Sequence, residues 1–121
     1  MERGRSELAE QLERLADEPI FLAAITASEL LHGVHCAALP AQRVRREGFV
    51  EKILGAIPVI PFDLLVARLH ARLWSELAAR GESVGQHDLL IAATALAHGH
   101  RVATLDQRSF PKIPGLNVLG W

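Results

Sequence analysis

Short apolar runs alternate along the chain with longer segments in which apolar residues recur every three or four positions. The runs are typical of strands buried on both faces, and the longer segments are typical of helices with one apolar face. The predicted strands are Ile20–Ala24, Ile57–Pro61, Arg101–Leu105 and Leu116–Leu119. The predicted helices are Arg3–Asp17, Ala27–Ala38, Ala41–Gly55, Asp63–Ala79 and Leu89–His98. This alternation predicts an α/β fold, a three-layer sandwich with a short, mostly parallel central sheet.

Two aspartates flank one predicted helix–strand unit. Asp88 stands at the start of the helix Leu89–His98, and Asp106 follows the strand Arg101–Leu105. Counted from Asp88 to His98, the helix rises about 16 Å at 1.5 Å per residue, and the strand returns about the same distance at 3.3 Å per residue. Both carboxylates are therefore expected at one edge of the sheet, where they suggest a divalent-metal site. Each also has a structural interpretation, Asp88 as a helix N-cap and Asp106 as a turn residue.

A third acid, Glu29, follows the predicted strand Ile20–Ala24. Thr26 and Glu29 fit a capping box at the start of the next helix, which gives Glu29 a structural role of its own. Helices that follow the strands of a parallel sheet begin at the carboxyl ends of those strands, where open α/β sheets bind their ligands. Glu29, Asp88 and Asp106 are therefore expected to converge at that edge.

Two other features have both a functional and a structural interpretation, and a third, Trp74, has a structural one. His87 stands beside Asp88 and could move protons, although a surface position is the simpler interpretation. The basic cluster Arg43–Arg46 could contact phosphates, or it could be a solvated helix face balanced by nearby glutamates. Trp74 lies in the periodic apolar helix Asp63–Ala79, where core packing is expected.

Composition places the chain among small enzyme domains. Its 121 residues predict one domain over residues 1–121, half of them are apolar, and the formal net charge is −1. This balance gives no charge signature of nucleic-acid binding. The single cysteine, Cys36, suits a reducing compartment. No signal-peptide pattern and no apolar run of membrane-spanning length is found in the sequence, so no membrane association and a cytoplasmic location are expected.

Three motifs together resemble the PIN-domain family, and most closely its VapC-type toxin ribonucleases from toxin–antitoxin systems. They are ITASELLHGV (Ile25–Val34), VGQHDLLIAATALAHGHRVATLDQRSF (Val84–Phe110) and IPGLNVL (Ile113–Leu119). Their order and spacing extend the resemblance over nearly the whole chain. Three acidic positions of the family fall on Glu29, Asp88 and Asp106, and the hydroxyl residue before the last acid falls on Thr104.

The resemblance implies a reaction and its partners. Glu29, Asp88 and Asp106 are expected to hold Mg²⁺ or Mn²⁺, and the Thr104 hydroxyl to orient a ligand or a phosphate. The implied reaction is metal-dependent endonucleolytic cleavage of a structured RNA such as transfer or ribosomal RNA. A cognate antitoxin that covers the acidic pocket, and a homodimer, are the implied protein partners.

One departure from the family pattern concerns the N-terminal segment. The family has a first strand, in the middle of the sheet, that ends in a further aspartate, whereas this chain opens MERGRSELAEQLERL, which predicts a helix. The chain is therefore expected to lack that strand and one of four metal-site acids. This leaves a second interpretation, a degenerate PIN module that binds an antitoxin or RNA without cleaving it.

Overall fold

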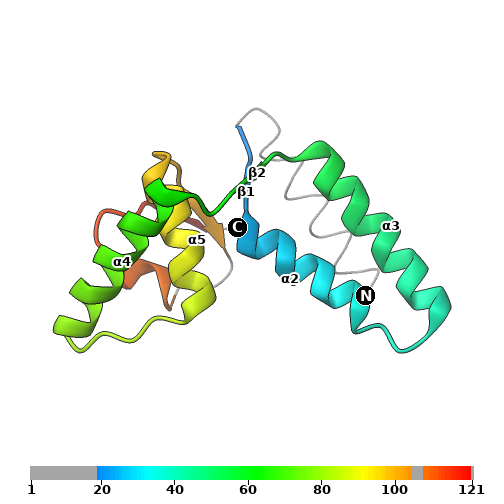
Figure 1. Ribbon diagram of the computed structural model, residues 1–121, viewed down its shortest axis with the longest axis horizontal. Helices are drawn as coiled ribbons and strands as arrows, with labels where there is room; N and C mark the ends of the chain where they lie inside the picture. The colour runs from blue at the N-terminus through cyan, green and yellow to red at the C-terminus, as the bar shows by residue number, and fades with distance from the viewer. Residues whose placement is uncertain (1–18, 105–107, 121) are drawn as a thin grey trace.

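The computed structural model describes residues 19–104 and 108–120, and the predicted helix Arg3–Asp17 lies outside them. Its helices are α2 (Ala24–His35), α3 (Pro40–Ala56), α4 (Leu64–Ala79), α5 (Gln86–Ala97) and the short 3₁₀ helix η1 (Phe110–Lys112). Its strands are β1 (Leu22–Ala23), β2 (Val59–Ile60), β3 (Val102–Thr104) and β4 (Val118–Gly120). The predicted α/β fold with short parallel strands is confirmed (Figure 1).

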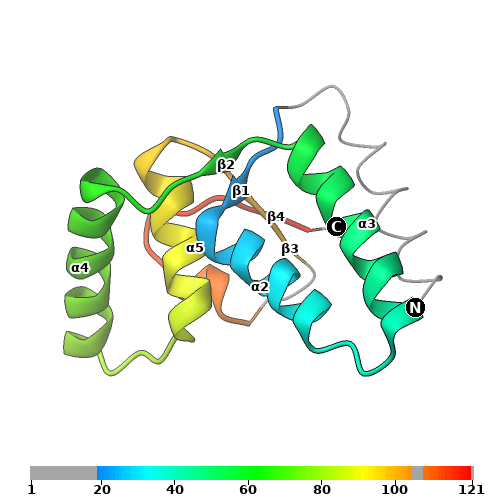
Figure 2. The same cartoon turned by 45° about the vertical axis from the view of Figure 1, so that its right-hand side comes forward.

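The described strands form two separate parallel pairs. β1 pairs with β2 through Leu22↔Val59 and Ala23↔Ile60. β3 pairs with β4 from Val102↔Val118 to Thr104↔Gly120. Figure 2 shows both pairs in the middle of the molecule, between α5 and the α2–α3 hairpin. The hydrogen-bonded ladders link β1 only to β2 and β3 only to β4, so the described part of the sheet is divided at its centre.

The main core lies where α4 packs on α5. Val66, Leu73 and Leu77 of α4 are buried against Leu89 and the alanines of α5. Small side chains on α5 let the two helices approach closely, and this packing holds the first turn of α5 in place. Trp74 does not join the core: its side chain is 58% exposed, so the expectation of core packing is wrong for this residue.

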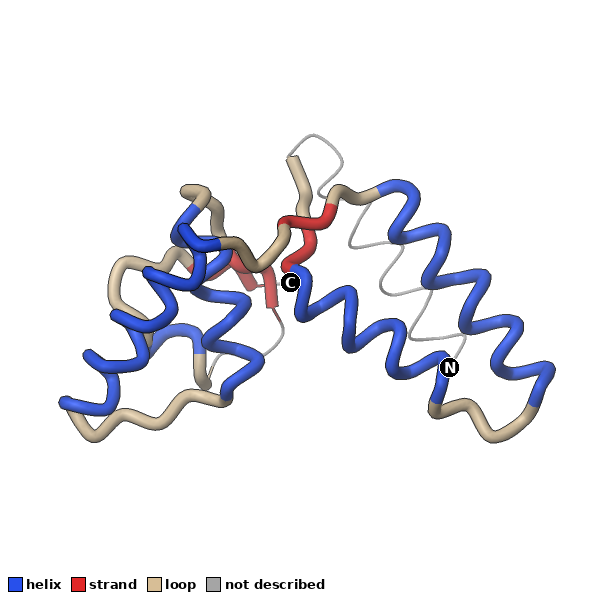
Figure 3. Tube along the Cα trace, in the orientation of Figure 1, coloured by secondary structure: helices blue, strands red, loops and turns tan. Residues whose placement is uncertain are grey.

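α2 and α3 pack side by side as a second helix pair (Figure 3). Val34 and Val50 are buried where the two helices meet. Arg46 donates to the Gly33 carbonyl at 2.9 Å, and Arg43 donates to the His35 carbonyl at 3.3 Å. Both arginines therefore satisfy carbonyls at the C-terminal end of α2, where cations are favoured, and they serve the fold in this way.

Helix ends correct several sequence-based boundaries. Asp63 caps α4 by accepting from the Val66 N–H at 3.0 Å, and Gly99 ends α5 with a φ of 70° that suits glycine. α2 begins at Ala24, and its N-cap, Ala23, makes no side-chain capping bond. The predicted capping box of Thr26 and Glu29 is therefore wrong, because both residues lie inside the helix. None of the helices in residues 19–104 and 108–120 is long and apolar enough to cross a membrane.

Candidate active site

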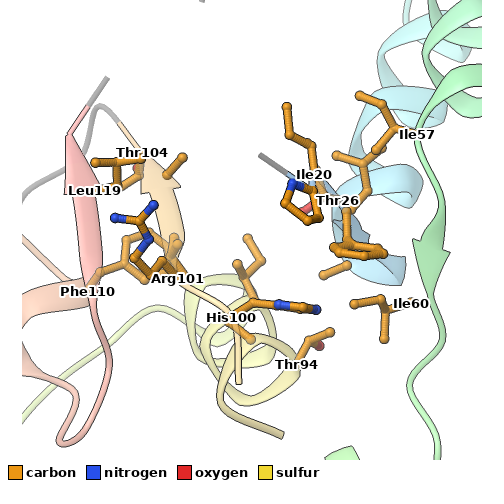
Figure 4. A pocket seen from close by; sticks show the side chains of 18 of the residues that line it. Ile20, Thr26, Ile57, Ile60, Thr94, His100, Arg101, Thr104, Phe110 and Leu119 are labelled. Atoms are coloured by element: carbon orange, nitrogen blue, oxygen red, sulfur yellow. The ribbon is translucent and has the colours of Figure 1, made fainter. Parts of the chain in front are cut away.

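A cavity of about 590 Å³ lies between the two strand pairs. β1 and the residues before it form one wall, and β3 forms the facing wall. In Figure 4 Ile20, Thr26 and Ile60 stand on one side, while Thr104 and Leu119 stand on the other. Its lining is mostly apolar, and Asp88 is the acid among the described residues that line it.

Asp88 reaches this cavity from the first turn of α5, where it is half-buried. The helix begins at Gln86 with Gly85 as its N-cap, so the interpretation of Asp88 as an N-cap is wrong. A carboxylate in the first turn of a helix is stabilised by the unpaired N–H groups and the helix dipole. The fold therefore presents the Asp88 carboxylate to the cavity at little local cost.

Glu29 lies outside the lining but is linked to Asp88 through its neighbour. The Glu29 Oε2 atom is 3.3 Å from Nδ1 of His87, the residue directly before Asp88. Both side chains are about half exposed, at 47% for Glu29 and 58% for His87. His87 thus lies inside α5 and connects α2 to the first turn of α5, a contact that the sequence pattern did not reveal.

The hydroxyl side of the site comes from β3 and the neighbouring helices. Thr104 lies at the end of β3 and lines the cavity. Thr26 of α2 and Thr94 of α5 line the same cavity. The Thr94 hydroxyl donates to the Leu90 carbonyl at 2.8 Å. Thr26 had been interpreted as a capping residue, and only the true start of α2 places it in the cavity. Asp106 lies outside the described residues.

The donor chemistry of these residues suits a hard divalent cation. Asp88 and Glu29 offer carboxylate oxygens, and Thr104 offers a hydroxyl. Mg²⁺ is commonly bound through one or two carboxylates and keeps several waters. Within the described ranges, which leave out Asp106, no three His, Cys, Asp or Glu side chains gather closely enough to hold an ion. The donor atoms of the described residues therefore suit such an ion, and these residues supply part of its site.

The profile of the PIN domain family matches residues 1–116, and the chain belongs to this family. Its curated relatives include Ribonuclease VapC1 of Rickettsia felis, 33% identical over 82% of this chain and 74% of the relative. The tRNA(fMet)-specific endonuclease VapC of Salmonella typhimurium is 30% identical over 83% of this chain and 74% of the relative. The resemblance to PIN domains and VapC-type ribonucleases is thereby confirmed.

Solved structures with the same fold include VapBC proteins. VapBC2 from Rickettsia felis, bound to a DNA fragment from their promoter, matches with a TM-score of 0.84 and 27% identity, over 93% of this chain and 84% of that chain. VapBC-5 from Mycobacterium tuberculosis, a member of the VapBC family of toxin-antitoxin systems, matches with a TM-score of 0.70 and 33% identity, over 83% of this chain and 79% of that chain.

Proposed function

We propose that this chain is a VapC-type toxin that cleaves structured RNA with Mg²⁺ or Mn²⁺ at the site formed by Asp88, Glu29, Thr104 and Asp106. The observation that carries the proposal is the position of Asp88 and Thr104 in one cavity, beside the Glu29–His87 pair. The curated relatives are named as ribonucleases and, in one case, as a tRNA(fMet)-specific endonuclease. A transfer RNA or a ribosomal RNA is therefore the substrate class to test first.

Each residue has a distinct part in this proposal. Asp88 and Glu29 would hold the ion through carboxylate oxygens, and Asp106 would serve as a further ligand or position the attacking water. When bound, such an ion activates a water and stabilises the charge that develops on the phosphate. Thr104 would orient the phosphate through its hydroxyl. His87 holds the Glu29 carboxylate next to the first turn of α5.

The proposal is tested by metal-dependent cleavage of RNA. The purified chain should cut transfer RNA or ribosomal RNA in Mg²⁺ or Mn²⁺, and EDTA should abolish the cleavage until the ion is restored in excess. The cut ends, mapped by primer extension, should fall at defined positions. Cleavage that continues undiminished in EDTA contradicts the metal-dependent mechanism.

A second candidate is a PIN module that binds RNA or an antitoxin without cutting. The specific observation in its favour is that Asp88 is accompanied by too few close acids, within the described residues, to complete an ion site. This candidate predicts an RNA gel shift without cleavage at any Mg²⁺ or Mn²⁺ concentration. The same assay therefore separates the two candidates.

Two protein partners belong to the proposal. The match to VapBC-5, a toxin-antitoxin system, supports a cognate antitoxin. A second copy of the chain is proposed to cover an aromatic row, formed by Phe62, His70 and Trp74. The ring of His70 lies 5.8 Å from that of Phe62 and 5.7 Å from that of Trp74. Exposed contiguous apolar surface of this kind commonly marks a protein–protein contact.

A further inference from the structure

The contact between Glu29 and His87 occupies one of the two carboxylate oxygens that Glu29 could offer to an ion. The Oε2 atom of Glu29 is 3.3 Å from Nδ1 of His87. A carboxylate only accepts hydrogen bonds, so Nδ1 of the imidazole ring carries the hydrogen of this contact. With Oε2 turned to His87, Oε1 is the oxygen that Glu29 has left for an ion.

Two helices fix the positions of these side chains. Glu29 lies in the second turn of α2 and His87 in the first turn of α5, and the two helices pack side by side (Figure 2). Successive residues of a helix point in directions about 100° apart. His87 is therefore directed to Glu29 of α2, while Asp88, the next residue, reaches the cavity. The contact holds Glu29 beside the Asp88 carboxylate with one oxygen already paired.

A carboxylate that offers a single oxygen does not suit all divalent ions equally. Mg²⁺ is bound in octahedral geometry at about 2.0–2.1 Å, through one or two carboxylates and several waters. Ca²⁺ takes about six to eight oxygens at roughly 2.3–2.6 Å, and a carboxylate can supply both of its oxygens to this ion. Ca²⁺ could therefore use both oxygens of Glu29 only after the contact with His87 is broken, whereas Mg²⁺ leaves the contact in place.

We propose that His87 restricts Glu29 to ligation through one oxygen and thereby makes the site prefer Mg²⁺ to Ca²⁺. His87 is a positioning residue in this role, because it acts on the ion through Glu29. Hydrogen bonds to ligating carboxylates commonly tune metal sites in this way. This selectivity rests on the proposed function, because it concerns the ion of that same site.

The size of the effect follows from the exposure of the pair. Both side chains are about half exposed, and such pairs change an equilibrium by no more than about fivefold. Ca²⁺ has to break the contact to use both oxygens, so its affinity is lowered by up to that factor. Loss of the His87 donor removes this penalty for Ca²⁺ and leaves Mg²⁺ without the same gain.

The measurement uses the 121-residue chain with Mn²⁺ as a reporter ion. The signal of free Mn²⁺ in electron paramagnetic resonance is lost on binding, and added Mg²⁺ or Ca²⁺ restores the signal by displacing the reporter. The two titrations give a dissociation constant for each ion. The ratio of the Ca²⁺ constant to the Mg²⁺ constant is the selectivity ratio, and it is obtained without RNA and independently of cleavage.

Variants of His87 separate the hydrogen-bond donor from the ring. His87→Phe keeps a ring and loses the Nδ1 hydrogen, so the selectivity ratio should fall about three- to fivefold. His87→Asn has an N–H donor at the same number of bonds from the backbone as Nδ1, so its ratio should stay near that of the unaltered chain. The matched control is His98→Phe, because His98 is exposed and follows the opposite end of α5. Its ratio should be unchanged.

Long-range proton–nitrogen NMR of the unaltered chain without added ion tests the contact itself and needs no variant. Nδ1 of His87 should carry a hydrogen, and a ring with its only hydrogen on Nε2 overturns the proposal. Equal selectivity ratios for His87→Phe and the unaltered chain, or equal falls for His87→Phe and His87→Asn, also overturn it and leave the proposed function standing. If the unaltered chain binds no Mn²⁺ at about 1 mM, a limit set by ordinary weak affinities, the metal-dependent function and this selectivity are both refuted.

Discussion

Replacement of Leu73 by alanine tests the packing that holds α5, and with it Asp88, against the rest of the molecule. Leu73 is 3% exposed in the core between α4 and α5. At about 0.8 kcal/mol for each buried methylene-sized group, the lost groups account for roughly 2 kcal/mol. The cavity left behind adds to this loss, so the free energy of unfolding should fall by about 2–5 kcal/mol.

The matched control is Leu65→Ala on the same helix. Leu65 is 56% exposed, so the same chemical change removes little buried surface. It should alter the free energy of unfolding by no more than about 0.5 kcal/mol. Urea unfolding, followed by far-ultraviolet circular dichroism, measures both variants. A domain of ordinary stability has about 5–15 kcal/mol, so the Leu73 loss is readily measured. Equal stability of the two variants refutes the described packing of α4.

Further predictions concern two glycines and the aromatic row. Gly99→Ala should lower the free energy of unfolding by about 1–2 kcal/mol because Gly99 has a φ of 70°. Gly33→Ala should raise it by up to about 1 kcal/mol, because Gly33 lies inside α2 with nothing within 4 Å of an added Cβ. If thermal unfolding shows stability changes of the same sign for both variants, the assigned backbone is contradicted. Trp74→Ser should convert a dimer to a monomer in light scattering after gel filtration, and an unchanged molar mass removes the aromatic row from the dimer contact.

The order of elements was readable from the sequence because apolar periodicity reflects which faces are buried. The lengths of the strands could not be read from the sequence. Ile20–Ala24 was predicted as a strand, and only Leu22–Ala23 forms one. An apolar run marks a buried segment, whereas strand pairing also requires a neighbouring backbone. Among residues 19–104 and 108–120, each of these strands pairs along one edge. The same cause shortens the predicted strand Ile57–Pro61 to Val59–Ile60.

Two local sequence patterns on helices led to wrong predictions. Thr26 and Glu29 have the spacing of a capping box, but the chain enters helix α2 earlier, at Ala24. Trp74 fits the apolar period of α4, yet it lies beside the narrow stripe that contacts α5 and remains exposed. Sequence alone shows how wide an apolar stripe is, and tertiary contacts decide how much of it is covered.

The candidate site was readable in part. The structure places Asp88 and Thr104 at one cavity. The alternation of helix and strand predicts that Asp88 and Asp106 share one edge of the sheet, whereas Thr104 was implied only by the family resemblance. The Glu29–His87 contact joins residues far apart in the chain, so no local pattern encodes it. The convergence predicted for Asp106 stays a prediction, because Asp106 lies outside the described residues.

The most direct test of the proposed function is RNA cleavage by the Asp88→Asn variant in Mg²⁺. The change keeps the size of the side chain and removes its charge, so the proposal predicts that cleavage falls to background while the unfolding midpoint stays close to that of the unaltered chain. Glu76→Gln is the matched control, since Glu76 lies on α4 and is half exposed. Its Oε1 atom is 3.8 Å from Nε of Arg72. This control should cleave RNA at the rate of the unaltered chain. Cleavage by Asp88→Asn at that same rate contradicts the central claim that Asp88 is part of the active site.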